Sequence, residues 1–269
     1  MISMESIQRK SLLYKSDVEY SDFSINHVLG CSHGCAFPCY AMMMAKRFGW
    51  IKNYEDWLNP KIVSNALELL DKEIPKYKNR ISFVHLCFMT DPFMYGYPDV
   101  GKMSLKIIQK LNDNGIKSTA LTKGILPKAL VEKKRYGTDN EYGITLVSLD
   151  GGFKKKFEPF SAPYSLRITS LKRLSDAGLH TWVSMEPYPT PNISEQDLSE
   201  ILEKVSFTDK IIFGKLNYNT KSRNFPDNKQ YYEECAKIVL DFCKENGIEC
   251  HIKYGTQLKY NKNTEKLFL

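Results

Sequence analysis

The chain has 269 residues, and its 38 lysines and arginines against 31 aspartates and glutamates give a formal net charge of +7. Apolar residues make up 42% and aromatic residues 12%, which is an ordinary globular composition and excludes a disordered chain. The longest apolar runs fall far short of the roughly 20 residues that cross a bilayer, so we expect no membrane partner. Residues 1–15 lack an apolar stretch, so we expect no secretory signal.

The cysteines indicate the compartment. Their count is seven, an odd number, and three of them cluster at positions 31, 35 and 39. A secreted disulfide framework usually has an even count in a short chain. We therefore expect a reducing, cytoplasmic location, where clustered cysteines indicate metal binding or catalysis.

Short apolar, β-branched runs bounded by turn residues recur along the chain, as expected of buried strands. The predicted strands are residues 23–29, 82–88, 117–122, 143–149, 180–185, 210–216 and 248–253. Amphipathic patterns between them predict helices at residues 60–71, 102–114, 165–177, 194–205 and 229–246. The polar residues 219–230 are predicted to form a loop, and residues 260–266 a loosely held tail.

A strand followed by a helix, repeated about six times, predicts an α/β fold with a parallel sheet and helices outside it. We expect a single domain over residues 1–269. Its body is a partial (β/α)6 barrel of the TIM type across residues 23–217, and the last helix and strand, residues 229–254, pack on it. Such sheets carry their chemistry at the C-terminal ends of the strands, so the residues after each strand are the candidates for a site.

The cysteine cluster directly follows the first predicted strand, as Gly30-Cys31-Ser-His-Gly-Cys35-Ala-Phe-Pro-Cys39-Tyr40. Three thiolates in one loop can converge on a metal centre. A structural zinc ion normally takes four protein ligands, and His33 is a candidate for the fourth, although it lies tightly between two of the cysteines. In a [4Fe–4S] cluster, three cysteines leave one iron open to an exogenous ligand.

This loop resembles that of the radical S-adenosylmethionine superfamily, and the resemblance extends to the branch that includes spore photoproduct lyase. It rests on an ordered set of motifs after successive predicted strands: Thr90-Asp91-Pro92, Thr122-Lys123, Glu158-Pro159 with Ala162-Pro163 and Arg167, and Glu186-Pro187. The spacing departs from the usual C-x3-C-x2-C pattern of the superfamily. Here it is C-x3-C-x3-C, and the extra residue alters the path of the loop before Tyr40.

The resemblance implies an enzyme of the radical S-adenosylmethionine class, of lyase or transferase type. Its catalytic centre would be a [4Fe–4S] cluster held by Cys31, Cys35 and Cys39. An external one-electron donor would drive reductive cleavage of S-adenosylmethionine to a 5′-deoxyadenosyl radical, which abstracts hydrogen from an unknown substrate. Positive charge and a run of aromatic residues after the second predicted strand make nucleic acid a candidate substrate class.

The resemblance also assigns roles to residues that follow the strands. Contacts to S-adenosylmethionine are expected from Tyr40 beside the adenine, Thr90 and Asp91 at the amino group, Lys123 at the carboxylate, Ser148 at the ribose or carboxylate, and Glu186 at the ribose or substrate. For Glu158 and Arg167 we favour an internal ion pair over a role as ligands.

Several alternatives stay open. Cys87, near the second strand end, is either a buried apolar cysteine, which we favour, or a hydrogen donor as in spore photoproduct lyase. The protein could instead be a non-enzymatic module whose cysteines hold an iron–sulfur cluster or zinc. A metal-free hydrolase using Glu158 and Glu186 as paired carboxylates is a further alternative, but it leaves the cysteine cluster unexplained.

Overall fold

The structure is a computed structural model that describes residues 4–16 and 22–256, so the polar tail at residues 260–266 lies outside it. Eight strands form one sheet in the order β11-β10-β9-β8-β7-β6-β3-β2. Their bounds are β2 (Leu13–Lys15), β3 (Phe23–Ile25), β6 (Phe83–Leu86), β7 (Lys117–Thr122), β8 (Glu141–Thr145), β9 (His180–Tyr188), β10 (Lys210–Lys215) and β11 (Glu249–Ile252).

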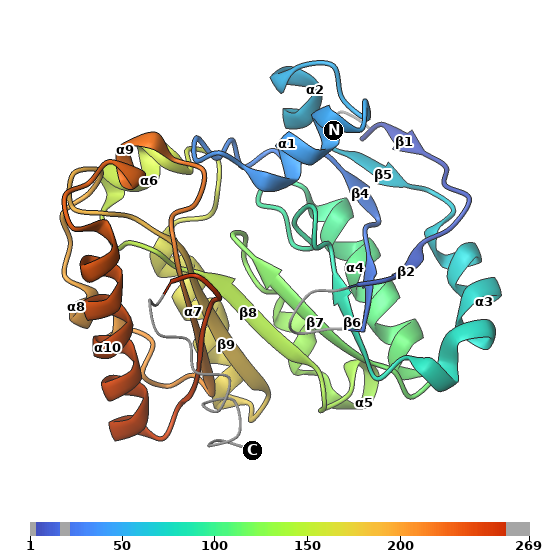
Figure 1. Cartoon of the computed structure of the whole chain (residues 1–269). Coiled ribbons are helices and arrows are strands. Elements are labelled where there is room, and N and C mark those ends of the chain that lie inside the picture. Colours follow the sequence, from blue (N-terminus) through green and yellow to red (C-terminus); the bar gives the residue numbers. More distant parts are fainter. Residues whose placement is uncertain (1–3, 17–21, 257–269) are drawn as a thin grey trace.

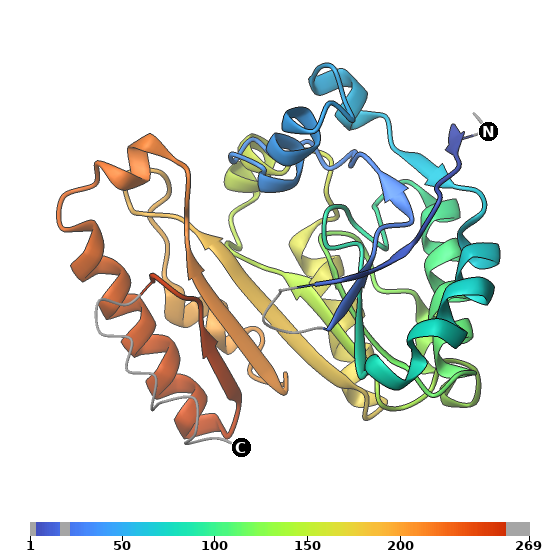
Figure 2. The same ribbon diagram turned by 45° about the vertical axis from the view of Figure 1, so that its right-hand side comes forward.

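Neighbouring strands from β3 to β11 are all parallel, whereas β2 runs antiparallel to β3. Strands β2 and β11 form the two edges of the sheet, which curves without closing (Figures 1 and 2). The expected α/β fold, a partial barrel with parallel strands, is therefore confirmed. The predicted strand at residues 248–253 is β11, which extends the sheet beyond β10.

Helices cover the outer face of the sheet, and shorter helices sit at the rim where the strands end (Figure 1). Their bounds are α1 (Tyr40–Arg47), α2 (Tyr54–Leu58), α3 (Ala66–Tyr77), α4 (Pro98–Asn112), α5 (Lys133–Tyr136), α6 (Gly151–Phe157), α7 (Tyr164–Asp176), α8 (Leu198–Glu203), α9 (Thr220–Arg223) and α10 (Asn228–Asn246). Helices α1, α2, α6 and α9 lie at the rim.

The long helices pack through the apolar stripes seen in the sequence. In α4, Val100, Ile107, Ile108 and Leu111 are fully buried, and the chain turns after the helix at Gly115, whose φ is +71°. These four residues lie on one face at helical spacing. Such packing fixes each strand in the sheet and so holds the loops at the strand ends in place.

The N-terminal third differs from the prediction. The predicted first strand is interrupted: residues 23–25 form β3, whereas β4 (Val28–Leu29) turns away into a second sheet of order β1-β5-β4. The start of the predicted helix at residues 60–71 is instead strand β5 (Lys61–Val63), between β1 (Ser6–Ile7) and β4. Pairing on both sides overrides the local helical pattern, and α3 begins only at Ala66.

Candidate functional site: a cavity lined by three cysteines

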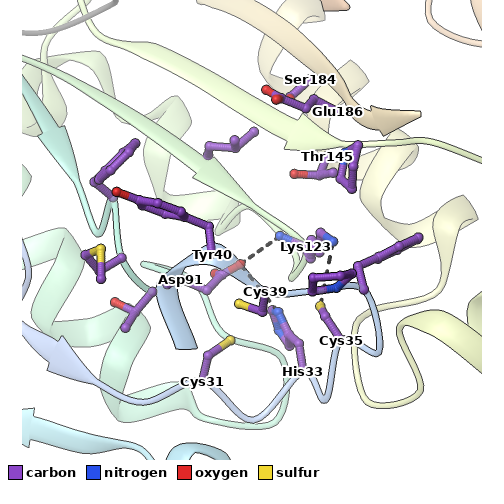
Figure 3. Close-up of a pocket in the computed structure, with 18 of the residues that line it drawn as sticks. Cys31, His33, Cys35, Cys39, Tyr40, Asp91, Lys123, Thr145, Ser184 and Glu186 are labelled. Atoms are coloured by element: carbon purple, nitrogen blue, oxygen red, sulfur yellow. Dashed lines mark hydrogen bonds and ion pairs between the residues drawn. The ribbon is translucent and has the colours of Figure 1, made fainter. Parts of the chain in front are cut away.

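A cavity of about 470 Å³ lies at the C-terminal ends of the central strands, where the fold class places its chemistry. One wall is the loop from Cys31 to Cys39. The opposite side carries Thr145, Ser184 and Glu186 from β8 and β9 (Figure 3). The remaining lining residues include His85, Cys87, Thr90, Asp91, Lys123, Lys215, Tyr218 and Lys253.

The cysteine loop is held by backbone hydrogen bonds to two other segments. The Cys31 amide donates to the Trp57 carbonyl at 2.8 Å, and the Ala36 amide donates to the Phe157 carbonyl at 2.9 Å. Gly34 has a φ of +66°, and a Cβ there would lie 2.7 Å from the Phe160 ring, so glycine meets both the backbone conformation and the close approach. The cavity wall is therefore shaped by α2 and α6 as well as by the loop itself.

All three cysteines are free thiols that line the cavity. Burial raises the pKa of Cys31, and it raises that of Cys35 to about 11. Within residues 4–16 and 22–256, no three His, Cys, Asp or Glu side chains converge where a single ion would sit. A four-iron cluster takes its thiolates on separate irons, so it fits three sulfurs spread along one wall.

His33 braces the cysteine loop. The Tyr95 amide donates to His33 Nε2 at 3.0 Å, so the ring proton is on Nδ1, which lies 3.6 Å from Asp91 Oδ2. Both ring nitrogens are thus committed to internal contacts. His33 holds the loop against the end of β6 rather than presenting a free nitrogen as a fourth zinc ligand.

Asp91 joins the ends of β6 and β7. Its Oδ1 accepts from the Phe93 amide at 2.8 Å and from the Thr122 hydroxyl at 2.6 Å, and its Oδ2 accepts from the Lys123 amide at 2.7 Å. The residue is 5% exposed and lines the cavity. Asp91 therefore fixes the turn that carries Lys123, and its expected contact to an amino group stays a prediction.

Lys123 reaches the cysteine loop. Its Nζ lies 3.6 Å from Cys35 Sγ and 2.7 Å from Glu158 Oε1. Burial alone would lower the pKa of Lys123, but Cys35 and Glu158 raise it above its ordinary value, so the ammonium stays charged. Arg167 Nη2 holds the other oxygen of Glu158 at 2.6 Å, and both of these side chains are 0% exposed. The expected internal ion pair of Glu158 and Arg167 is confirmed.

The remaining expected residues divide into two groups. Tyr40, Thr90 and Glu186 line the cavity. Ser148 does not: it is fully buried, and its hydroxyl accepts from the Asp150 amide at 3.0 Å. Strand β8 ends at Thr145, four residues before the end of the predicted strand at residues 143–149, and Thr145 lines the cavity wall.

Two further observations bear on the alternatives. Glu158 is absent from the cavity wall and bound by two cations, so it does not face Glu186 as one of a pair of catalytic carboxylates. Cys87 packs with Val28 and Met94, its Sγ lies 3.4 Å from His27 Nδ1, and it also lines the cavity. The predicted strand at residues 82–88 contained Cys87, but β6 ends at Leu86, and Cys87 lies beyond it with a φ of +56°.

Two relatives of this chain are uncharacterised proteins. An uncharacterised protein of Methanocaldococcus jannaschii is 26% identical over 239 residues, which is 88% of this chain and 87% of that protein. An uncharacterised protein of Acidianus two-tailed virus is 26% identical over 197 residues, 70% of this chain and 63% of the viral protein.

Among solved structures, spore photoproduct lyase complexed with a dinucleoside spore photoproduct has a TM-score of 0.67 at 13% identity, over 92% of this chain and 80% of that one. Streptococcus suis SuiB bound to S-adenosylmethionine has a TM-score of 0.53 at 15% identity, over 85% of this chain and 46% of that one. These likenesses concern the fold.

In the part of the chain that the structure describes, none of the helices has the length and apolar character needed to cross a bilayer.

Residues 25–205 match the family model of the radical SAM superfamily. This match spans β3 to α8 and contains the cysteine loop, Asp91, Lys123 and Glu186. The chain therefore belongs to the radical SAM superfamily.

Proposed function

We propose that the protein is a radical S-adenosylmethionine enzyme whose [4Fe–4S] cluster is held by Cys31, Cys35 and Cys39. The observation that carries the proposal is the lining of one strand-end cavity by these three thiols, with the half-buried ammonium of Lys123 beside one of them. When bound, the cluster and S-adenosylmethionine supply a 5′-deoxyadenosyl radical that abstracts hydrogen from the substrate. An external one-electron donor completes the chemistry.

The chain's own residues bind, orient and enclose the cofactor. Thr90 and Asp91 take the methionine amino group and Lys123 its carboxylate, while Tyr40 at the rim packs beside the adenine. Thr145 and Ser184 offer hydroxyls on the opposite wall for the ribose, the role expected of Ser148 from the sequence.

Glu186 lies on the same side and is turned toward Lys253, with 3.9 Å between Oε2 and Nζ. Gly214 leaves room for both of these side chains, since a Cβ there would lie 2.9 Å from the Glu186 carboxyl carbon. We propose that Glu186 meets the ribose or the substrate. The apolar portion of the wall excludes water from the radical.

The decisive experiment is anaerobic reconstitution followed by reduction with dithionite. Wild-type protein should carry iron and release 5′-deoxyadenosine, and alanine at any one of Cys31, Cys35 or Cys39 should abolish the release. Cys250→Ala is the matched control, because Cys250 is a half-buried free thiol outside the cavity wall. A colourless zinc protein would favour the non-enzymatic module, and normal cleavage by any of the three variants would refute the ligand set.

For the substrate we propose nucleic acid as the class to test first. Spore photoproduct lyase binds a dinucleoside photoproduct and SuiB a precursor peptide, so the shared fold does not choose between them. Aromatic side chains at the rim, including Tyr40 and Tyr218, and the cavity lysines Lys215 and Lys253 suit stacked bases and phosphates. Binding of a single-stranded oligonucleotide that weakens steeply with salt would support this class.

A further inference from the structure

A second cavity, of about 410 Å³, lies beside the cysteine cavity and is called the side cavity below. It is lined by the segment from Lys215 to Thr220 together with Ser222, Arg223 and Asn228. Four residues line both cavities: Lys215, Leu216, Asn217 and Tyr218. One short segment at the end of β10 therefore forms the boundary between the site of radical chemistry and the side cavity.

Internal hydrogen bonds hold the segment that lines the side cavity, and they do not involve the charged groups of its two cations. The Asn219 side chain accepts from the Ser222 backbone amide at 3.1 Å, and the Asn228 side-chain Nδ2 donates to the Ser222 carbonyl at 2.6 Å. Lys215 and Arg223 form no ion pair with a carboxylate of residues 4–16 or 22–256. The cavity thus presents two positive charges without an acidic partner among these residues.

The backbone around the side cavity is strained. Tyr218, just before α9, has a φ of +59°, and Asp227, directly before α10, has a φ of +53°. A non-glycine residue in this left-handed region is strained, because its Cβ lies too close to the following carbonyl oxygen. Tyr218 is 71% exposed, so packing in the core does not offset this strain. Strain of this kind collects at ligand sites, and here it presents an aromatic ring at the boundary of the two cavities.

We propose that the side cavity binds a phosphate group of the substrate, with Lys215 and Arg223 as its charged donors and Tyr218 beside the adjoining part of the molecule. A phosphate monoester carries about −1.5 to −2 charges at neutral pH, which two unpaired cations match. The guanidinium of Arg223 suits phosphate because it donates through a planar fork. The reacting part of the substrate then lies in the cysteine cavity, a placement that rests on the proposed function.

The test titrates inorganic phosphate into the reconstituted full-length protein, with binding followed by 31P NMR. Arg223→Gln and Lys215→Gln should each weaken phosphate binding about tenfold, the loss expected for one charge-assisted hydrogen bond. Lys221→Gln is the matched control, because it removes the same charge from α9 but lies on neither cavity wall. Phosphate that does not bind, or equal weakening by Lys221→Gln and Arg223→Gln, would overturn the proposal.

Two additional probes identify the source of the phosphate. A nucleoside monophosphate and a single-stranded oligonucleotide are compared on wild type and Arg223→Gln, and the source is the probe whose binding depends on Arg223. Release of 5′-deoxyadenosine by the same wild-type preparation is measured alongside. If wild type releases none while phosphate binding still depends on Arg223, the proposed function fails and the phosphate site stands.

Discussion

Replacing Glu158 with glutamine tests whether this buried carboxylate holds the site together. Its two oxygens bind Lys123 at 2.7 Å and Arg167 at 2.6 Å. Removing one partner of a buried ion pair costs about 3–5 kcal/mol, because the other charge is left without a partner. Burial alone would raise the pKa of Glu158, but the two cations lower it from 4.5 to about 2, which corresponds to about 3 kcal/mol.

We therefore expect Glu158→Gln to lower the free energy of unfolding at pH 7 by about 3 kcal/mol, measured by urea titration under reducing conditions. Asp176→Asn is the matched control: its pair with Lys172 has the same 2.6 Å separation, but both side chains are more than half exposed. Exposed pairs contribute about 0–1 kcal/mol, so this variant should stay within that range.

The pH dependence gives an independent check on the same residue. Because the pKa of Glu158 is lower in the folded protein, its contribution is present above pH 4.5 and is lost as the pH falls toward about 2. Glu158→Gln should remove this part of the acid slope and Asp176→Asn should keep it. A Glu158→Gln protein as stable as wild type at pH 7, with an unchanged acid slope, would refute the structural role.

Three further predictions use the same measurements or the cofactor. A Cβ at Gly124 would lie 1.8 Å from the Phe93 carbonyl oxygen, so Gly124→Ala should lower the free energy of unfolding by about 1–3 kcal/mol. A Cβ at Gly151 would meet nothing within 4 Å, so Gly151→Ala should leave the free energy of unfolding unchanged. Equal urea midpoints for the two variants would contradict this prediction. Burial lowers the pKa of His85 to about 4, so the free energy of unfolding of the wild type should decline from pH 6.5 to about 4 as the unfolded chain takes up a proton at this residue. His85→Gln should make that decline shallower. An unchanged pH slope in the variant would contradict this prediction. Lys123→Ala should weaken S-adenosylmethionine affinity in equilibrium dialysis at unchanged iron content, and loss of iron as well would make Lys123 a structural residue.

The sequence predicted the fold well where apolar runs and turn residues coincide with the strand ends. The strand predicted at residues 117–122 matches β7, and the helix predicted at residues 229–246 matches α10 to within one residue. Prediction failed where tertiary pairing decides the conformation. Residues 61–63 pair with strands from two distant segments, and no local pattern shows that those partners are present.

The site shows the same division. The spacing of the three cysteines indicated that they lie together, and the residue types at positions 158 and 167 indicated an ion pair. Ser148 was misplaced because Leu146 and Val147, both fully buried, continue the apolar run beyond the last ladder residue of β8. An apolar run indicates which residues are buried but not where strand pairing ends, so the sequence did not indicate that Thr145 lines the cavity. The side cavity was not predicted, because no sequence pattern in the polar residues 219–230 indicates that Tyr218 adopts a positive φ beside them.

The buried charges beside the cysteines need an explanation other than stability. A buried ion pair is often no more stabilising than apolar residues of the same volume, because desolvation offsets the attraction. Here the Arg167–Glu158 pair holds a third charge, Lys123, 3.6 Å from Cys35 Sγ. An apolar replacement could fill the volume but could not hold an ammonium at a sulfur. We therefore infer that the network of Arg167, Glu158 and Lys123 serves to hold a positive charge at the cavity. There it would face the cysteine thiolates and the carboxylate of S-adenosylmethionine.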